Sequence, residues 1–517
     1  MIRTLDDLLA QDTDAPALIW RGTQISYAQL NRMVEAAAQD WRALGLAPGA
    51  RVAVYLAKTP ETVAALFAAS RAGMVVVPVN PVLKAPQVRH ILEDSGAEIL
   101  VSAAARLAAL REAEALPPGL RALYSIDADA LSRAWPGPAA DARHTPGHFA
   151  PAALDDGLAA ILYTSGSTGR PKGVMLSHRN LLLSADSVRQ YLAVTATDRL
   201  LAALPFSFDY GLNQLTCGFL AGACVSLIDY LTPRDVVRAV ARDGITLLGG
   251  VPPLWSQLAA AEWPDDARAS LRAITNSGGR MPRAVLGRLR ALLPDTRIFL
   301  MYGLTEAFRS TYLDPSLVDA RPDSIGKAIP YAEVYVCRPD GSLTDPGEPG
   351  EIVHLGPLVA QGYWRDAERT AARFREPPAA AGPRAPGERA VWSGDKAVRD
   401  ADGFLTFVGR DDEMIKTSGY RVSPTEVEEA AYASGLVADC VALGVPDPAL
   451  GEAIVLVAAP VADMADAEAG LPAAMTRALP GFMLPRRIIW RESLPRNPNG
   501  KLDRPTIAAA ARAELEA

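Results

Sequence analysis

The residues Tyr163–Gly173 combine side-chain types that suit the binding of a polyphosphate. Two glycines, Gly166 and Gly169, let the backbone turn tightly and come close to a ligand. Backbone N–H groups, hydroxyls and a lysine together form anion-binding loops in proteins. A flexible Gly/Ser linker is the alternative, but this tract directly follows the apolar run 158–162, which predicts a buried strand. The polar side chains of the tract are Thr164, Ser165, Ser167, Thr168 and Lys172.

The position of the lysine in this loop excludes a Walker motif. That motif places Gly-Lys-Ser/Thr at the start of a helix, whereas Lys172 lies between Pro171 and Gly173. The tract resembles instead the signature loop of the adenylate-forming superfamily: acyl-CoA synthetases, adenylation domains of peptide synthetases, and luciferases. Further motifs follow in the order of that superfamily from Ser26 to Arg504. The resemblance implies a ligase that joins a carboxylate to ATP, releases pyrophosphate and passes the acyl group to a pantetheine thiol.

The segment Tyr302–Glu306 resembles the second core motif of the superfamily. By this resemblance Thr305 contacts the α-phosphate and Glu306 holds Mg²⁺, and both join Lys172 in the predicted catalytic set. Mg²⁺ prefers oxygen ligands and is commonly shared between one carboxylate and substrate phosphates, so the residue type agrees with this role. We therefore expect ATP and Mg²⁺ as cofactors. The adenine site implied by the resemblance comprises Gly278, Gly279, Arg280, Tyr302 and Gly303.

Charged residues later in the chain extend the resemblance. Asp395 matches an aspartate that holds both ribose hydroxyls, and a carboxylate has enough lone pairs to accept from a vicinal diol. Arg410 matches an arginine that reaches ribose or phosphate. Lys501 matches the catalytic lysine, and a cation between the attacking carboxylate and the α-phosphate stabilises the charge that develops. The resemblance also makes Asp412 the pivot of a mobile C-terminal domain and places Gly419 beside the thiol channel.

Asp209 bears on the class of acid. Many fatty and aryl acyl-CoA ligases have a histidine-bearing turn in this stretch, whereas Phe208-Asp209 resembles amino-acid-activating members, whose aspartate pairs with the substrate ammonium. An unpaired carboxylate facing an acyl pocket is costly, and a substrate amine would relieve that cost. Two alternatives are an ion pair with a neighbouring protein group, such as Arg309, and a cap on the next helix. The other pocket positions implied by the resemblance are Tyr210, Asn213, Gly250, Ile274, Asn276, Met301, Arg309 and Ser310.

The identity of the acceptor depends on the same question. We favour an amino acid loaded onto a separate carrier protein, and the alternative is an acyl-CoA ligase that uses a non-amino acid and CoA. The segments Tyr302–Asp314 and Arg321–Lys327 resemble both stand-alone ligases that load proline onto carrier proteins and acyl-CoA ligases associated with exosortase systems. A nucleotide-binding regulator or a luciferase-like oxidase without ligase turnover is disfavoured, because Glu306 and Lys501 are both present.

The elements that position these residues follow an α/β pattern. Helical and strand patterns alternate over residues 1–110, which is typical of a mainly parallel sheet. Loops after the strands of such a sheet are where ligands bind. Short alternating strands begin at Ser324, and the last hundred or so residues return to an α+β pattern. We therefore expect an α/β protein with layered sheets in a large N-terminal domain at 1–410, a small β-barrel subdomain at about 324–410, and a mobile α+β C-terminal domain at 411–517.

Composition excludes several classes of function. A chain of 517 residues is too long for one ordinary core, and a net charge of −7 gives no basic footprint for nucleic acid. We find no apolar run of transmembrane length and no signal-peptide pattern at the start, so we expect a cytoplasmic enzyme without a membrane partner. The four cysteines include no Cys-x-x-Cys pair, which argues against a zinc site or a disulfide framework.

Overall fold

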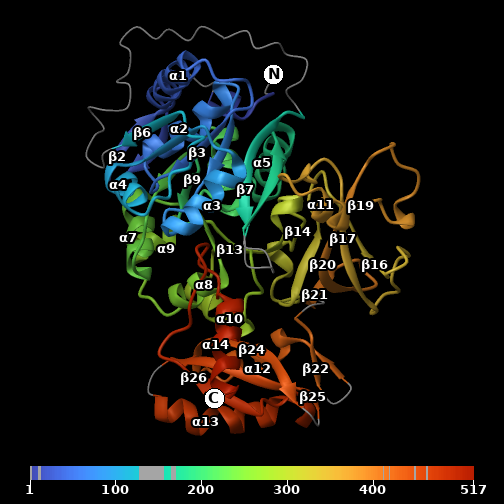
Figure 1. Ribbon diagram of the computed structural model, residues 1–517. Helices are drawn as coiled ribbons and strands as arrows, with labels where there is room; N and C mark the ends of the chain where they lie inside the picture. The colour runs from blue at the N-terminus through green and yellow to red at the C-terminus, as the bar shows by residue number, and fades with distance from the viewer. Residues whose placement is uncertain are drawn as a thin grey trace.

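The computed structural model describes residues 3–9, 13–126, 156–164, 171–410, 413–417, 420–447, 450–461 and 464–516. Two large sheets and their helices form the N-terminal part, and the C-terminal unit lies below them in Figure 1, coloured red. Four predicted phosphate-loop residues (Ser165, Gly166, Ser167 and Thr168), the predicted pivot Asp412 and the predicted channel residue Gly419 lie outside the described residues.

The first sheet is parallel from β7 to β6, and β8 and β18 add an antiparallel edge. Strands β3, β4 and β5 confirm the predicted strands between residues 51 and 102. Strand β6 was not predicted, because it lies beyond residues 1–110, where helical and strand patterns alternate. In sheet order the strands are β18 (Gly362–Tyr363), β8 (Lys172–Ser177), β7 (Leu158–Thr164), β4 (Val75–Pro78), β3 (Arg51–Tyr55), β5 (Ile99–Ala103) and β6 (Ala122–Ile126).

The second sheet has a parallel half, β13 to β1, and an antiparallel half, β16 to β14. In sheet order the strands are β16 (Glu333–Cys337), β17 (Pro349–Leu355), β20 (Ala390–Arg399), β21 (Leu405–Arg410), β15 (Ser324–Ala328), β14 (Thr311–Tyr312), β13 (Arg297–Tyr302), β12 (Ala273–Asn276), β11 (Leu247–Gly250), β9 (Arg199–Ala202), β10 (Cys224–Leu227), β1 (Pro16–Trp20) and β2 (Thr23–Ser26), and β19 (Phe374–Arg375) pairs with β20.

The antiparallel half is the region predicted as a β-barrel subdomain. It lies to the right of the other layers in Figure 1 and encloses its own small apolar clusters around Val336 and Val353. Its strands are hydrogen-bonded through β15 and β14 to β13, so this subdomain continues the second sheet. That continuity places Asp395 and Arg410 near the ends of the parallel strands β12 and β13.

Helices cover and separate the sheets. Ser26, Thr59 and Ser177 each accept a backbone hydrogen bond at the start of a helix, as N-cap residues do. Every residue of α2 is buried, and its Phe67 ring lies 5.4 Å from that of Phe219 in α6. The N-terminal helices are α1 (Tyr27–Ala43), α2 (Pro60–Arg71), α3 (Ala85–Ser95), α4 (Ala104–Glu112), α5 (His178–Leu192), α6 (Asp209–Leu220), α7 (Pro233–Asp243), α8 (Pro252–Leu258), α9 (Asp265–Ser270), α10 (Arg283–Leu292) and α11 (Ala367–Arg373).

The C-terminal unit is a sheet with an apolar cluster on each face. Alternation along β24 produces this arrangement: Cys440 and Ala442 belong to one cluster, and Val441 and Leu443 belong to the other. The elements are β22 (Ile415–Thr417), β23 (Tyr420–Val422), β24 (Val437–Asp447), β25 (Gly451–Pro460), β26 (Arg487–Trp490), α12 (Pro424–Ala433), α13 (Met464–Ala478) and α14 (Arg504–Glu516).

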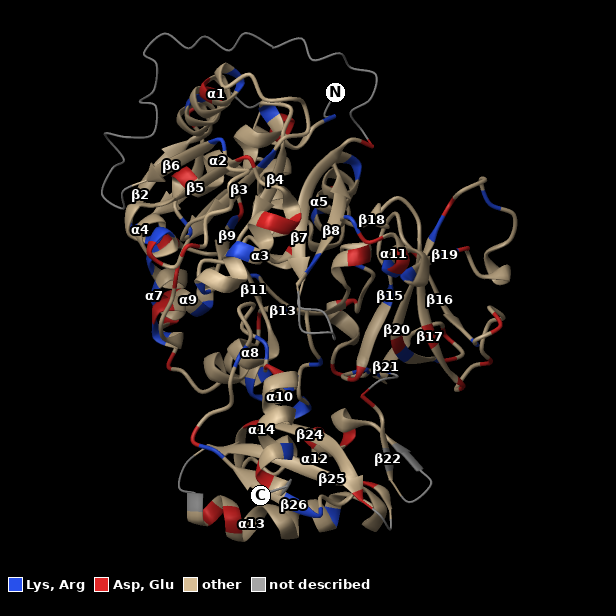
Figure 2. Ribbon diagram, in the orientation of Figure 1, with Lys and Arg blue, Asp and Glu red and all other residues tan. Residues whose placement is uncertain are grey.

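Charge is distributed over the whole molecule. Figure 2 shows basic and acidic positions interspersed along the elements of both parts, without a continuous basic face in this view. Among the described residues, no helix combines the length and the apolar character needed to cross a membrane.

Candidate active site

A cavity of about 380 Å³ lies at the carboxyl ends of the parallel strands β12 and β13. Strand ends of this kind are the usual ligand site of open α/β sheets. The curved antiparallel half of the second sheet and a loop of the C-terminal unit complete the walls. The structure brings together in this lining the predicted residues Thr164, Lys172, Asp209, Asn276, Gly278, Gly279, Arg280, Met301, Tyr302, Gly303, Thr305, Glu306, Asp395, Arg410 and Lys501.

Glu306 is held in a short hydrogen-bonded chain. The Lys172 Nζ atom lies 3.1 Å from Glu306 Oε1 and 2.6 Å from the hydroxyl of Tyr363, which itself donates to Glu306 Oε1 at 2.6 Å. Burial raises the pKa of Glu306, but Lys172 and Tyr363 more than offset this effect, so the pKa lies below its ordinary value. Glu306 is therefore an ionised oxygen donor at neutral pH.

The carboxylate of Glu306 fits a magnesium ion that is shared with a ligand. In the part of the chain that the structure describes, no group of three or more His, Cys, Asp or Glu residues could hold a metal. Mg²⁺ sites that use one or two carboxylates complete their coordination with substrate phosphates and water. The residues present therefore fit Mg²⁺ bound together with a polyphosphate and do not form an independent metal site.

Arg373 is a cation of the cavity that the sequence analysis missed. It lines the cavity from the end of α11, and its Nε atom is buried without a hydrogen-bond partner among the described residues. Its guanidinium also helps to lower the pKa of Glu306. Arg373, Lys172, Arg410 and Lys501 supply cations that suit a polyphosphate, in a lining that also contains the carboxylates of Asp209, Glu306, Asp323 and Asp395.

Asp395 connects the two halves of the second sheet. Its Oδ2 atom accepts from the hydroxyl of Tyr302 at 2.6 Å, and its Oδ1 atom accepts from Arg410 Nε at 3.0 Å. The Tyr302 ring stacks on His354 with a centroid distance of 5.9 Å. Because each carboxylate oxygen can accept two hydrogen bonds, Asp395 keeps capacity for two ligand hydroxyls.

Lys501 reaches the cavity from the C-terminal unit. Its Nζ atom lies 4.8 Å from the centroid of the Phe208 ring, and burial lowers its pKa although Asp209 acts in the opposite direction. Gly278 makes room for it: a Cβ at that position would lie 2.5 Å from Lys501 Cε, and the φ of Gly278 is +81°. A glycine is therefore required there both by space and by backbone conformation.

Asn80 holds the loop that carries Lys501, and no sequence motif indicates this role of Asn80. Asn80 Nδ2 donates to the carbonyl oxygen of Pro498 at 2.8 Å. Inside the loop, the backbone N–H of Lys501 donates to Asn497 Oδ1 at 3.0 Å. The end of β4 thus anchors a segment that lies more than four hundred residues further along the chain.

Asp209 has partners within the chain. It is 6% exposed, and its Oδ1 atom accepts from the hydroxyl of Thr305 at 3.2 Å. Burial raises the pKa of Asp209, while the charges of Arg309 and Lys501 oppose the rise. No ion pair within 4.0 Å links Asp209 to Arg309 in the described structure. Asp209 is the first residue of α6, and the N-cap position before it is occupied by Phe208. Neither alternative from the sequence therefore holds in its simple form.

A second cavity, of about 30 Å³, lies behind Met301, which lines both cavities. Tyr210, Asn213 and Arg309 line it as predicted for an acyl pocket, and Gln214, Gly249 and Thr275 line it without having been predicted. The position of Gln214 could have been found, because it lies four residues after Tyr210 on the same face of α6.

Three predicted pocket residues line neither cavity. Ile274 is part of the main apolar cluster, since alternate residues of a strand face opposite sides and Thr275 is the one that faces the second cavity. A Cβ at Gly250 would meet the indole of Trp255 at 2.8 Å, so this glycine faces α8. Ser310 is fully buried, and its backbone N–H donates to the carbonyl of Tyr302. The structure therefore does not bring these three predicted positions to either cavity.

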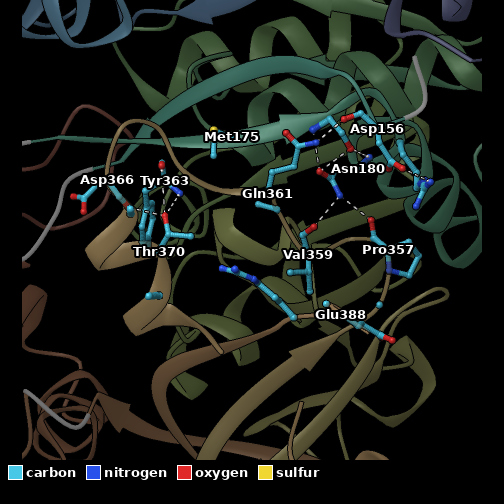
Figure 3. Close-up of a pocket in the computed structure, with 18 of the residues that line it drawn as sticks. Asp156, Met175, Asn180, Pro357, Val359, Gln361, Tyr363, Asp366, Thr370 and Glu388 are labelled. Carbon is cyan, nitrogen blue, oxygen red and sulfur yellow. Dashed lines mark hydrogen bonds and ion pairs between the residues drawn. The ribbon is translucent and has the colours of Figure 1, made fainter. Parts of the chain in front are cut away.

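An open hollow of about 1180 Å³ lies beside the active-site cavity, between α5, β8, β18 and α11 (Figure 3). Its polar groups serve the fold: Asn180 Nδ2 donates to the carbonyls of Pro357 and Val359, and the Tyr363 backbone N–H donates to Thr370 Oγ1. These bonds fix the segment that presents the Tyr363 hydroxyl to Glu306.

The AMP-binding enzyme family matches residues 5–364, and the AMP-binding enzyme C-terminal domain matches residues 426–501. The chain belongs to the AMP-binding enzyme family. It is an ATP-dependent, AMP-forming ligase of the adenylate-forming superfamily, and enzymes of this superfamily use ATP with Mg²⁺. The predicted superfamily and the fold class are confirmed, whereas the roles of individual residues stay predictions.

Relatives of two kinds align with nearly the whole of this chain. A feruloyl-CoA synthase of Amycolatopsis sp is 33% identical over 495 residues, which cover 94% of each chain. A linear gramicidin synthase of Brevibacillus parabrevis is 30% identical over 503 residues, which cover 96% of this chain and 6% of that protein. The solved o-succinylbenzoate coenzyme A synthetase (MenE) from Bacillus subtilis, in complex with ATP and a magnesium ion, is 25% identical with a TM-score of 0.80 over 98% of both chains.

Proposed function

We propose that this ligase activates an organic acid without an amino group and transfers it to CoA. The observation that carries the proposal is the environment of Asp209: Thr305 donates to its carboxylate, and the charges of Arg309 and Lys501 act on it. These neighbours compensate part of the cost of burying the carboxylate without a substrate ammonium, although burial still keeps the pKa of Asp209 above its ordinary value. The similarity to a feruloyl-CoA synthase over nearly the whole chain supports the same choice.

In the first half-reaction, a carboxylate oxygen of the acid attacks the α-phosphorus of ATP. The bond from that phosphorus to the bridging oxygen breaks, and pyrophosphate leaves with the electron pair. We assign Lys501 to the space between the two anions, and Lys172, Arg373 and Arg410 to the phosphate oxygens. Fixed cations aimed at developing charge are an effective means of catalysis because they need no reorganisation. Mg²⁺, held by Glu306, would neutralise charge on the phosphates.

In the second half-reaction, the CoA thiol loses its proton and its sulfur attacks the carbonyl carbon of the acyl-adenylate. AMP leaves and a thioester forms. Since Lys501 occupies the cavity from the C-terminal unit, this unit must move to admit the thiol. We propose a domain boundary near Arg410 and a pivot at Asp412, supported by the separate apolar clusters of the C-terminal unit.

Asp412→Pro should therefore allow one half-reaction and block the other. Proline fixes φ near about −65° and so restricts rotation at the pivot. Rates of pyrophosphate exchange, and of thioester formation from pre-made adenylate, would be measured on the same folded preparation. If both rates fell in proportion to the loss of folded protein, the assignment of the pivot to Asp412 would be wrong.

A panel of acids tests the proposed function. We expect acids without nitrogen to drive ATP–pyrophosphate exchange and to form CoA thioesters, with the matching α-amino acids at least about tenfold slower, because a substrate ammonium would enter a site that already holds cations. Asp209→Asn should reduce the use of these acids severalfold at most, since Asn can still accept from Thr305.

The competing function is an amino acid:carrier-protein ligase, which the similarity to a gramicidin synthase favours. It predicts the opposite pattern in the same panel. Amino acids would be preferred, and Asp209→Asn would weaken their use by about a hundredfold or more, because an ammonium would lose its buried partner. That result, without CoA thioester formation, would overturn the acyl-CoA ligase proposal.

A further inference from the structure

The guanidinium of Arg309 is buried and has no hydrogen-bonded partner among the described residues. Arg309 is 2% exposed, and its guanidinium carbon lies 4.1 Å from the centroid of the Tyr210 ring. Its Nε atom is fully enclosed, and within the described ranges the side chain of Arg309 donates no hydrogen bond and makes no ion pair within 4.0 Å. The charge of Asp209 acts on it from a greater distance. A desolvated cation with unused donors is costly for a protein to keep.

The side chain of Arg309 lines the second cavity, which contains another unused polar atom. Gln214 is 8% exposed, and its Oε1 atom is buried without a partner among the described residues. The hydroxyl of Tyr210, in contrast, donates to the carbonyl of Thr275 at 2.8 Å. Two residues that line one small space thus each carry a buried polar atom without a partner among the described residues, and such atoms normally have partners in native proteins.

The space itself is kept open by a missing side chain. A Cβ at Gly249 would lie 2.7 Å from Gln214 Nε2 and 3.1 Å from the Tyr210 hydroxyl. The volume of about 30 Å³ exceeds the roughly 10–15 Å³ that one water needs. It has room for a substituent of a few atoms. Apolar side chains such as Val188 and Leu248 also line the cavity, together with the polar residues Asn213 and Thr275.

The second cavity continues the path of the acyl group. Met301 lines both cavities, and Asp209 and Tyr210, one in each lining, are neighbours at the start of α6. An acid whose carboxylate reacts beside Lys501 would extend past Met301 toward Arg309. The far end of the acyl group would then meet the unused donors.

We propose that the acid substrate carries an oxygen-containing group at the end remote from the reacting carboxylate, and that Arg309, with Gln214, binds this group. A hydroxyl and a carboxylate share the required chemistry, because both accept hydrogen bonds from a guanidinium. The inference rests on the proposed ligase function and specifies its substrate class. It makes Arg309 a specificity-determining residue that does not contact the reacting atoms.

Matched acids test the inference. Straight-chain monocarboxylic acids of three to eight carbons would be compared with their ω-hydroxy and α,ω-dicarboxylic counterparts, and benzoate with 4-hydroxybenzoate and terephthalate, in pyrophosphate exchange. We expect at least one oxygen-bearing acid to exceed its unsubstituted counterpart by about tenfold to a hundredfold in kcat/KM, the range of a hydrogen bond to a charged group. Comparison of the hydroxy acids with the dicarboxylic acids identifies which oxygen-containing group is bound.

Arg309→Met keeps the length of the side chain and removes the donors. It should bring the oxygen-bearing acid down to within about threefold of its unsubstituted counterpart in a variant that stays folded, which its thermal unfolding curve checks. Gly249→Ala is an independent variant that fills the cavity without changing charge, and it should reduce the same preference.

Two results would overturn the inference: unsubstituted acids used as well as the oxygen-bearing ones throughout the panel, or a preference that survives in both Arg309→Met and Gly249→Ala. Failure of the proposed function is a different outcome. In that case exchange would show the preference for oxygen-bearing acids, but no CoA thioester would form from any of them.

Discussion

Replacing Lys501 with alanine should lower the rate of adenylate formation by about a hundredfold to a thousandfold, the cost of removing one group that stabilises developing charge. Transfer of the acyl group from pre-made adenylate to CoA should continue near the wild-type rate, because the lysine acts before that step. ATP–pyrophosphate exchange measures the first half-reaction, and consumption of a synthetic acyl-adenylate with CoA measures the second.

Two companion variants make this expectation sharper. Lys327→Ala removes an exposed lysine of β15 and should change neither half-reaction. Asn80→Ala removes the hydrogen bond to the carbonyl of Pro498 and should slow adenylate formation by about fivefold to tenfold, the worth of one hydrogen bond. Near-normal pyrophosphate exchange in Lys501→Ala, or an equal loss in both half-reactions, would show that this lysine is not the adenylation cation.

The predicted residues that line the cavity share a local sequence pattern. Lys172, Glu306 and Asp395 each stand in or directly after a strand with a recognisable run of glycine and hydroxyl residues around it. In an open α/β sheet the strand ends converge on one ligand site, so local patterns suffice to place such residues. The same reasoning predicted the alternation of helices and strands, because apolar periodicity records which face of an element is buried.

The residues that were missed depend on how distant segments pack. Tyr363 meets Glu306 across 57 positions, and Asn80 meets Pro498 across 418. No short pattern encodes such an approach, because it results from the docking of one layer or domain on another. Strand β6 was missed for a different reason: it lies at the edge of the sheet, and only its last residue, Ile126, is buried, so its side chains carry little apolar periodicity.

Glu306→Gln should abolish most of the first half-reaction by removing the carboxylate that lies beside Lys172. We expect pyrophosphate exchange to fall by about a hundredfold or more at a fixed Mg²⁺ concentration, and the concentration of Mg²⁺ needed for half-maximal rate to rise, because glutamine offers the metal a neutral oxygen. A titration of Mg²⁺ at saturating ATP and acid measures both effects. Glu348→Gln is the matched control. Like Glu306, Glu348 forms an ion pair with a basic residue, here Arg338, but it lies beside a surface turn of the antiparallel sheet.

The same variant should also lose stability, and the loss should depend on pH. Glutamine leaves the charge of Lys172 without its partner, and breaking a buried pair costs roughly 3–5 kcal/mol. We expect the lower end of that range or less, because a fifth of the Lys172 side chain is exposed and glutamine can still accept from Tyr363. Since the pKa of Glu306 lies below its ordinary value of 4.5, the wild-type contribution is fully present above pH 4.5 and is lost as the pH falls through the lowered pKa. The difference in unfolding free energy between wild type and Glu306→Gln should therefore narrow in acid, and a difference that stayed constant from pH 7 to pH 3 would contradict an ionised Glu306 paired with Lys172.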